Sequence, residues 1–425
     1  MVTQASLVGD LQSIVGAEYA RVPKDEEFAV DGMRPQVIVE PGSYAEVAAA
    51  MCYANNAGLA VIALGNGHFS WIGNIPSRYD IALSVSRLNA VVEYEPADLT
   101  ITCQAGTTLD DVHGLLTGNG QMIPFGWGAG PARISRLLAL ARGESHLAWG
   151  SARDFTIGMR VVTAEGRTIR AGGKVVKNVA GYDLCKLFIG SMGTLGIIIE
   201  ASLKLAPAPQ AEELVDLEFT SLSQACNFAW ELRKRGLALA YVNLDRPMSI
   251  TEEGAMPRGL VRLGVHLAGT TAGVERSRRE MLELAPIAGG KLDGTSAPKL
   301  EGALPAWTNG GHPITCEARV LPSSVSDLVE HVDREAPGVF LNVSPLTGSV
   351  SMTWVAGLDE DRVRRLRAIT TRLDGSLVVT GCDIELKRRI DVFGDPPPSF
   401  ELMRRVKQQF DPNGILSPGR FVGRL

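Results

Sequence analysis

Residues 172–207 read GGKVVKNVAGYDLCKLFIGSMGTLGIIIEASLKLAP, with glycine at positions 181, 190, 193 and 196 among several polar side chains. Ordinary packing does not require this combination, since glycine weakens regular structure and is used where the backbone needs unusual freedom. From residue 197 onward, apolar residues alternate with Ile198, Glu200, Ser202 and Lys204. This period of two predicts a half-buried strand directly after the glycine-containing segment.

The size of the chain indicates more than one domain. Its 425 residues exceed the roughly 250 to 300 at which single cores stop growing. The composition, 45% hydrophobic and 21% charged with a net charge of -5, is typical of a globular protein and gives no reason to expect nucleic acid as a partner. With no long apolar run and no secretory signal, we expect a cytoplasmic chain without membrane insertion, free or held at the inner face of the membrane by partners.

The six cysteines lie far apart, without a CxxC pair or a Cys and His at metal-ligand spacing. We therefore expect small buried side chains in a reducing compartment and no metal site.

Local signals in the first half predict a helix, a buried strand and a glycine loop in succession. A capping box, Ser43 with Glu46, predicts a helix over about 44–57. The short apolar run 59–64 is typical of a strand buried on both faces, and the loop GNGHFSWIGN, 65–74, follows at once. Such a loop lets backbone N–H groups approach an anion closely. Further along, a turn at Glu165-Gly166 predicts a β-hairpin.

The pattern changes after a proline-containing linker at 207–213. Strands and helices then alternate, which predicts an α+β domain of two βαβ-like halves over an antiparallel sheet. Near the end of the chain, Leu402, Val406 and Phe410 share one face of a predicted helix that stops at Asp411-Pro412.

Two common nucleotide-binding patterns are excluded. The loop at 65–73 is only a loose GxGxxG, with no convincing helix and acidic residue after it, and the chain has no GxxxxGK[ST]. Taken in order, however, four motifs resemble the FAD-binding domain of the vanillyl-alcohol oxidase, or PCMH-type, flavoprotein family, and within it the FAD-binding accessory subunits of glycolate oxidase. These motifs are SRLN, SARDFTIGMRVV, GGKVVKNVAGYDLCKLFIGSMGTLGIIIEASLKLAP and LMRRVKQQFDPNGILSPGRF.

The resemblance covers about 28–207 and 390–425, and it implies an α+β fold with three segments. Residues 1–207, with a core from about 28, are expected to form a two-lobed PCMH-type FAD-binding domain. Residues 208–385 are expected to form an α+β cap domain with an antiparallel sheet, and 386–425 to return to the FAD domain.

The resemblance also implies FAD as a non-covalent cofactor and assigns residues to it. The pyrophosphate of FAD is expected at the loop 65–70. The glycine-containing segment quoted first is expected to close over the flavin, and the strand that carries Gly196 to Ile198 is expected to pass the adenosine end. The implied cofactor-binding residues are Gly65, Asn66, Gly67, His68, Phe69, Ser70, Ser135, Lys177, Asn178, Gly193, Gly196 and Ile198. Each has an ordinary structural interpretation as well: the loop as a tight connection, and Lys177 with Asn178 as a solvated turn.

The chain departs from the family pattern at Ile134 and Ser135, where relatives have two glycines, and at Ser417, where they have asparagine. Side chains there are expected to crowd a contact meant for bare backbone. In one interpretation Arg133 and Arg136 replace those contacts by charge pairing with the pyrophosphate. In the other, the chain is a flavin-free structural subunit that keeps the fold but has lost FAD binding.

Catalytic residues remain unassigned because the histidine-rich motif of catalytic relatives is missing. His312 and the run Lys387–Arg389 are candidates for binding an acid, but an ordinary loop histidine and a solvated face are the favoured explanations. The resemblance therefore implies an accessory subunit of a dehydrogenase for glycolate- or lactate-type 2-hydroxy acids. Its partners would be a paralogous catalytic flavoprotein subunit and an iron-sulfur subunit. A self-sufficient oxidase is a third alternative.

Overall fold

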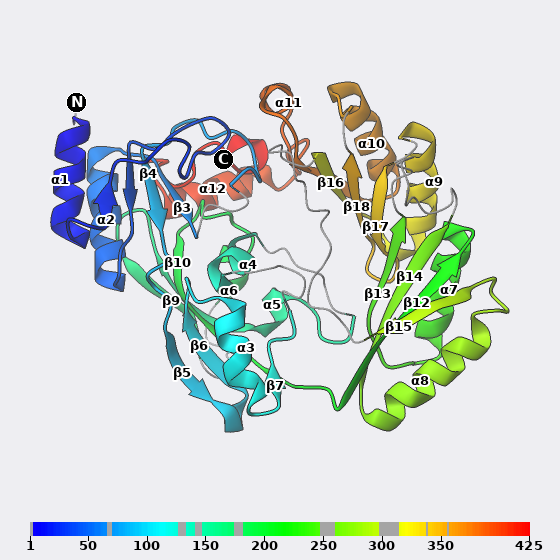
Figure 1. Cartoon of the computed structure of the whole chain (residues 1–425). Helices are drawn as coiled ribbons and strands as arrows, with labels where there is room; N and C mark the ends of the chain where they lie inside the picture. The colour runs from blue at the N-terminus through cyan, green and yellow to red at the C-terminus, as the bar shows by residue number, and fades with distance from the viewer. Residues whose placement is uncertain are drawn as a thin grey trace. The chain divides into compact units, whose positions relative to one another are not determined.

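The computed structural model describes residues 3–65, 70–125, 133–140, 147–173, 182–246, 260–296, 314–336, 339–354 and 357–425. The chain divides into two compact units (Figure 1). Unit 1 comprises Met1–Glu144, Gly150–Ala208 and Asp395–Leu425, and unit 2 comprises Ser145–Trp149 and Pro209–Gly394. The predicted boundaries after 207 and 385 lie near the divisions at 208 and 394, and the roles assigned to the domains stay predictions.

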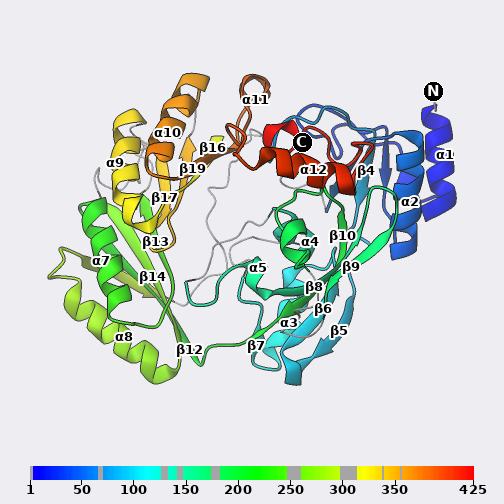
Figure 2. The ribbon, with the colours of Figure 1, turned by 180° about the vertical axis from the view of Figure 1, so that it is seen from behind.

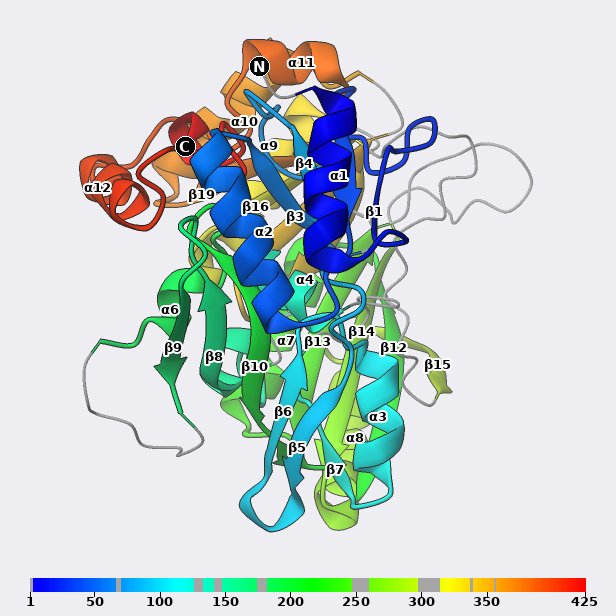
Figure 3. The ribbon, with the colours of Figure 1, turned by 90° about the vertical axis from the view of Figure 1, so that its left-hand side faces the viewer.

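The first sheet of unit 1 has four strands in the order β1-β2-β4-β3. These are β1 (Ala20–Arg21), β2 (Val37–Val39), β3 (Val61–Leu64) and β4 (Ile81–Ser84). Strand β4 runs parallel to both β2 and β3. Helices α1 (Gln4–Val15) and α2 (Tyr44–Ala57) lie beside one another along this sheet (Figure 3). The predicted helix at 44–57 is confirmed: the Ser43 side chain accepts a hydrogen bond from the Glu46 N–H, and Gly58 ends the helix at φ 67°.

The second sheet of unit 1 is antiparallel, with five strands in the order β5-β6-β10-β8-β9. These are β5 (Val91–Glu95), β6 (Thr100–Gln104), β8 (Thr156–Val162), β9 (Thr168–Gly172) and β10 (Ile197–Lys204). The predicted hairpin is β8–β9, and Gly166 takes φ 79° in its turn. The remaining elements of this part are α3 (Leu109–Thr117), β7 (Gln121–Met122), α4 (Ile134–Leu140), α5 (Ala152–Phe155), α6 (Cys185–Phe188) and β11 (Ala206–Pro207).

Strand β10 departs from the prediction of a half-buried strand, since every residue before Lys204 is buried. Its polar face carries its own partners instead of facing water. The Glu200 carboxylate pairs with Arg160 Nε at 2.8 Å and accepts from the Tyr44 hydroxyl at 2.8 Å. The Ser202 hydroxyl bonds Thr102 Oγ1 at 2.8 Å. A central strand can therefore show alternating polarity and still be buried on both faces.

The C-terminal helix α12 (Phe400–Phe410) forms as predicted, but with a different buried face. Leu402 is 64% exposed, so the predicted line of apolar residues is wrong at that position. Lys407 is buried in its place, and the Phe410 ring packs edge-on against Phe188 at 5.3 Å. Lys407 is buried because its ammonium donates hydrogen bonds to buried oxygens.

Unit 2 is built on an eight-stranded sheet in the order β15-β12-β14-β13-β17-β18-β16-β19, with antiparallel pairs throughout the strands described. The strands are β12 (Ala211–Phe219), β13 (Leu239–Arg246), β14 (Val261–Gly269), β15 (Lys291–Ser296), β16 (Ile314–Arg319), β17 (Phe340–Ser344), β18 (Ser349–Trp354) and β19 (Ser376–Gly381). The helices are α7 (Leu222–Lys234), α8 (Thr271–Leu284), α9 (Val325–Glu335), α10 (Glu360–Arg372) and the short α11 (Ile384–Arg389). Helices α7 to α10 cover one face of the sheet and enclose the apolar core (Figure 2). The α+β fold with an antiparallel sheet is confirmed.

A buried histidine makes the stability of unit 2 depend on pH. Burial lowers the pKa of His266, on β14, to about 4. Between pH 6.5 and 4 the His266 imidazole binds a proton in the unfolded chain but not in the folded chain. The free energy of unfolding therefore falls as pH falls through this range. The wild type loses free energy of unfolding between pH 7 and about pH 4.5. We expect His266→Gln to lose roughly 2 to 3 kcal/mol less over the same range.

Urea unfolding at pH 7 and at pH 4.5 or so measures this difference. Glu212 Oε1 lies 3.8 Å from His266 Nε2, and burial raises the pKa of that carboxyl, which opposes the slope in wild type and variant alike. The matched control is His331→Gln, on α9. Equal slopes for His266→Gln and His331→Gln would contradict the assignment.

Candidate functional site

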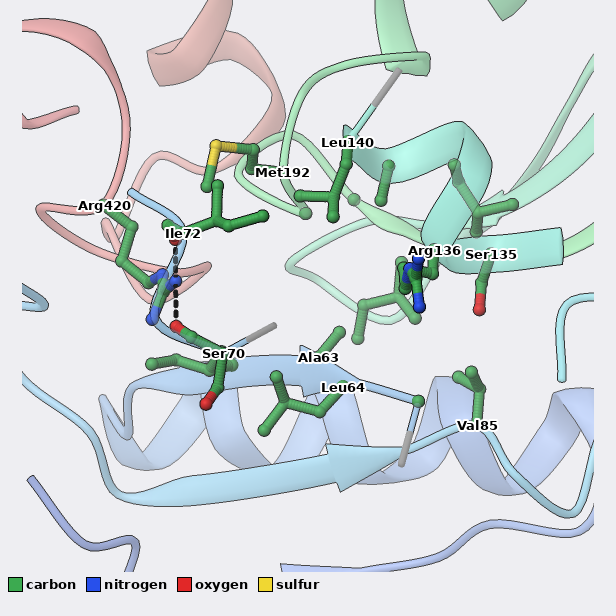
Figure 4. Close-up of a pocket in the computed structure, with 17 residues that line it drawn as sticks. Ala63, Leu64, Ser70, Ile72, Val85, Ser135, Arg136, Leu140, Met192 and Arg420 are labelled. Atoms are coloured by element: carbon green, nitrogen blue, oxygen red, sulfur yellow. Dashed lines mark hydrogen bonds between the residues drawn. The ribbon is translucent and has the colours of Figure 1, made fainter. Parts of the chain in front are cut away.

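A cavity in unit 1 opens at the carboxyl ends of β3 and β4 (Figure 4). Its empty space is about 770 Å³, part of it open to solvent. Residues 62–65 form one wall, Val85 after β4 adds to it, and α4 and the segment 192–198 form the others. Open sheets with parallel strands bind ligands outside the carboxyl ends of those strands, so the position is that of a binding site.

The cavity gathers predicted site residues that are far apart in the sequence. Those of the predicted set that lie in the described part of the chain all line it: Gly65, Ser70, Ser135, Gly193, Gly196 and Ile198. The others, Asn66, Gly67, His68, Phe69, Lys177 and Asn178, lie outside the described residues. The structure thus brings one part of the predicted set together, and the roles of these residues toward a cofactor stay predictions.

The two glycines of the opening stretch serve different geometric needs. Gly193 takes φ 72°, a left-handed conformation that side chains with a Cβ rarely adopt. At Gly196 a Cβ would overlap Val161 Cγ1 and lie 3.1 Å from the Val162 carbonyl oxygen. Gly196 is therefore required by close packing of β10 on β8, and Gly193 by the turn before it.

Arg420 is a cavity residue that the sequence did not single out. Its side chain is buried, and its Nη2 donates to the carbonyl of Ser70 at 2.7 Å and to that of Ile72 (Figure 4). Its Nη1 is buried without a hydrogen-bond partner among the described residues. Burial lowers the pKa of Arg420, and Asp31 and Tyr79 oppose that shift.

An arginine keeps its charge in proteins, so Arg420 brings a positive charge to the cavity wall, and such a wall favours an anionic ligand. The signal for Arg420 was available in the sequence, since this arginine is part of the motif SPGRF.

At α4, the residues that depart from the family pattern differ in whether they line the cavity. Ile134 is fully buried and is not among the lining residues, so its side chain does not crowd the cavity wall as expected. Ser135 and Arg136 do line the cavity, and burial lowers the pKa of Arg136. Arg133 Nη1 instead donates to the carbonyl of Gly106, so of the two arginines expected at the pyrophosphate only Arg136 reaches the cavity.

Ser417 supports the wall and is not part of it. It is buried in a left-handed conformation, φ 43°, which Asn adopts more readily than Ser. Its N–H donates to the Val61 carbonyl at 2.9 Å, and a Cβ on Gly193 would lie 3.6 Å from its Oγ. The C-terminal segment is thereby joined to β3 beside the cavity.

The catalytic candidates do not form a site in the part of the chain that is described. His312 lies outside it. Lys387, for which a solvated face was expected, is 1% exposed, and Arg388 pairs with Glu385 at 2.5 Å. Among the described residues, no histidine lines the cavity and no cluster of metal ligands occurs. No described helix is long and apolar enough to cross a membrane.

Comparison with known protein families matches both ends of unit 1. Residues 35–172 match the FAD binding domain, and residues 395–421 match the C-terminal domain of FAD linked oxidases. The chain thus contains two domains of FAD-linked oxidases. The family resemblance drawn from the sequence is thus confirmed, and FAD is the cofactor.

Sequence similarity to known proteins extends over most of the chain. The D-lactate dehydrogenase of Archaeoglobus fulgidus is 27% identical over 92% of both chains. Glycolate oxidase subunit GlcE of Escherichia coli is 28% identical over 81% of this chain and 87% of its own. Glycolate oxidase subunit GlcD of Bacillus subtilis is 23% identical over 92% of this chain and 89% of its own.

Solved structures of PCMH-type enzymes share the fold. p-Cresol methylhydroxylase, with substrate bound, superposes with a TM-score of 0.75 at 17% identity and covers 99% of this chain and 97% of its own. The 4-ethylphenol oxidase from Gulosibacter chungangensis, in an isoeugenol complex, gives 0.75 at 15% identity over 98% and 96%.

The cavity of this chain fits FAD on its own chemistry. The positive charge of Arg420 on the wall suits a phosphate group, and the wall residues Ile62, Leu64 and Ile72 offer apolar surface for the less polar parts of a dinucleotide.

Proposed function

We propose that this chain is the FAD-binding accessory subunit of a multi-subunit dehydrogenase for 2-hydroxy acids of the glycolate or lactate type. The observation that carries the proposal is the cavity beyond β3 and β4, with the buried Arg420 on its wall. Bound FAD supplies the oxidising chemistry, since a flavin accepts electrons from its substrate or passes them onward.

The residues of the chain hold the cofactor in this proposal. Arg420 donates to one phosphate, and Arg136, from α4, contributes a second positive charge. The walls around Gly65 and Gly193 leave backbone bare beside the cofactor. Since no His or Cys is among the described lining residues, we propose that FAD is held without a covalent bond.

The accessory role is supported by two features. The chain is similar to GlcE, whose name marks it as one subunit of a glycolate oxidase. The sequence lacks the histidine-rich motif of catalytic relatives, and the described histidines lie away from the cavity: His113 on α3, His266 on β14 and His331 on α9. The proposed partners are a paralogous flavoprotein that oxidises the acid and an iron-sulfur subunit that carries electrons onward. Similarity to two different glycolate oxidase subunits, GlcE and GlcD, supports a multi-subunit enzyme.

Arg136→Gln tests the charge at α4. The substitution keeps hydrogen-bonding capacity and removes the positive charge, so we expect the dissociation constant of FAD to rise roughly tenfold. Titration of the apoprotein with FAD, followed by quenching of flavin fluorescence, measures it. High salt should weaken FAD binding to the wild type more than FAD binding to the variant, because salt screens the charge that the variant lacks. Equal affinities at low salt would contradict a role for this charge.

The accessory role is tested with glycolate and D-lactate and an artificial electron acceptor. The FAD-loaded chain alone is expected to give no turnover above background, and co-expression with a paralogous flavoprotein subunit from the same source is expected to restore it. Robust turnover by the isolated chain would contradict the accessory role. A partner subunit equally active without this chain would contradict it as well.

A further inference from the structure

A buried ion pair at the end of α12 joins three segments of unit 1. Lys407 Nζ donates to Asp411 Oδ2 at 2.5 Å and to the carbonyls of Thr194 and Leu416, each at 2.8 Å. An ammonium has three protons to donate, so each has an oxygen partner. Asp411, 2% exposed, in turn accepts the N–H groups of Ile415 at 2.9 Å and Leu416 at 2.8 Å.

The oxygens that meet at this ammonium belong to segments that shape the cavity. Thr194 lies in the turn between Gly193 and Gly196, both of which line the cavity. Leu416 precedes Ser417, and these two residues are paired with Val61 of β3 through a parallel bridge and the Ser417 N–H. One side chain therefore fixes the 193–196 turn and the C-terminal segment at once.

Stability alone does not explain a lysine at this position. Well-packed apolar residues often replace buried ion pairs without loss of stability, because they avoid the desolvation of two charges. An apolar residue at 407 cannot hold the carbonyls of Thr194 and Leu416, which come from segments more than 200 positions apart. The ammonium therefore fixes the backbone at Thr194 relative to the backbone at Leu416.

We propose that Lys407 and Asp411 are positioning residues for the flavin site, which they serve by holding the 193–196 turn and the 415–417 segment as one wall. Neither residue is among those that line the cavity. The inference depends on the proposed function only in that the cavity holds FAD.

The test compares Lys407→Met, which fills a similar volume without donors, with Leu11→Ala as the control. Leu11 is fully buried on α1, away from the cavity, so its truncation lowers the stability of unit 1 and leaves the wall intact. Each variant is titrated with FAD at a temperature at which circular dichroism shows it to be folded. The visible circular dichroism of the bound flavin reports the shape of its site.

We expect Lys407→Met to raise the dissociation constant of FAD at least about tenfold and to change the visible dichroism. Leu11→Ala should lower the melting temperature and leave both readouts within about twofold of the wild type. Wild-type affinity and dichroism in Lys407→Met would overturn the proposal, as would equal losses in the two variants.

Should Lys407→Met fail to fold, Lys407→Gln keeps part of the hydrogen bonding and takes its place, with the same expected direction and the same contradicting result. The wild-type titration separates this inference from the proposed function. Wild type that binds FAD and has no role in acid oxidation would contradict the proposed function, and the Lys407 comparison would still decide the inference.

Discussion

Arg420→Met is expected to raise the dissociation constant of FAD roughly 10- to 100-fold, since a hydrogen bond from a charged donor contributes about 1.5 to 3 kcal/mol. The guanidinium is already held on the cavity wall by the carbonyls of Ser70 and Ile72, so it presents its charge to the cofactor without further ordering. Pre-organisation of this kind strengthens binding because little entropy is lost. Fluorescence titration of the apoprotein measures the change.

Arg78→Met is the matched control. Arg78 also joins separate segments of unit 1, donating to the carbonyls of Gly58 at 3.0 Å and Gly414 at 3.2 Å, but it is not among the residues that line the cavity. We expect its loss to leave FAD affinity within about twofold. The role of Arg420 would be refuted if both substitutions left the affinity unchanged, or if both lowered it equally.

Gly196→Ala is expected to destabilise unit 1 by about 1 to 3 kcal/mol and to weaken FAD binding, because the new methyl group overpacks a closed contact. The added carbon would overlap Val161 Cγ1 and lie 3.3 Å from Phe188 Cε1. To relieve the overlap, β10 must move away from β8 and carry the cavity wall with it. Thermal unfolding of the apoprotein and FAD titration measure the two effects.

The overlap provides its own rescue test. Val161→Ala removes the methyl group that the new Cβ meets, so the double variant should regain roughly 1 kcal/mol over the sum of the two single losses. Gly114→Ala on α3 is the control, since Gly114, like Gly196, has no left-handed conformation but has nothing within 4 Å of its added Cβ. Strictly additive losses would show that the contact with Val161 is not the cause.

The sequence predicted the elements whose signals are local. The helix after Ser43 formed because its cap lies within one turn, and the hairpin at Gly166 because its turn residue sits between the two strands. The cavity residues Gly193 and Ser135 were predicted through the family resemblance, because ordered motifs carry information that periodicity does not.

The predictions failed where distant partners decide burial. Glu200 reads as solvent-facing, yet it is buried because Tyr44, 156 positions away, donates to its carboxylate. Lys407 lies outside the predicted apolar line of α12, yet it is buried because Thr194, 213 positions away, accepts a hydrogen bond from its ammonium. The motif SPGRF includes Arg420, but its place on the cavity wall depends on Ser70, 350 positions earlier, whose carbonyl accepts from its guanidinium.

The same limit explains the error about crowding at α4. Counting residues against the family pattern placed Ile134 at the cofactor, but the helical turn directs that side chain away from the cavity and leaves Ser135 and Arg136 on the wall. A pattern of residue types does not show which way each side chain lies relative to the cavity, because the packing of α4 within unit 1 decides this.

The visible absorbance spectrum of the purified chain after reconstitution with FAD tests the central claim most directly. We predict the two absorbance bands of a protein-bound flavin in the wild type, with the colour released to the supernatant on acid precipitation because the bond is not covalent. A folded chain that stays colourless would contradict FAD binding by this cavity, and yellow colour retained in the pellet would contradict its non-covalent character.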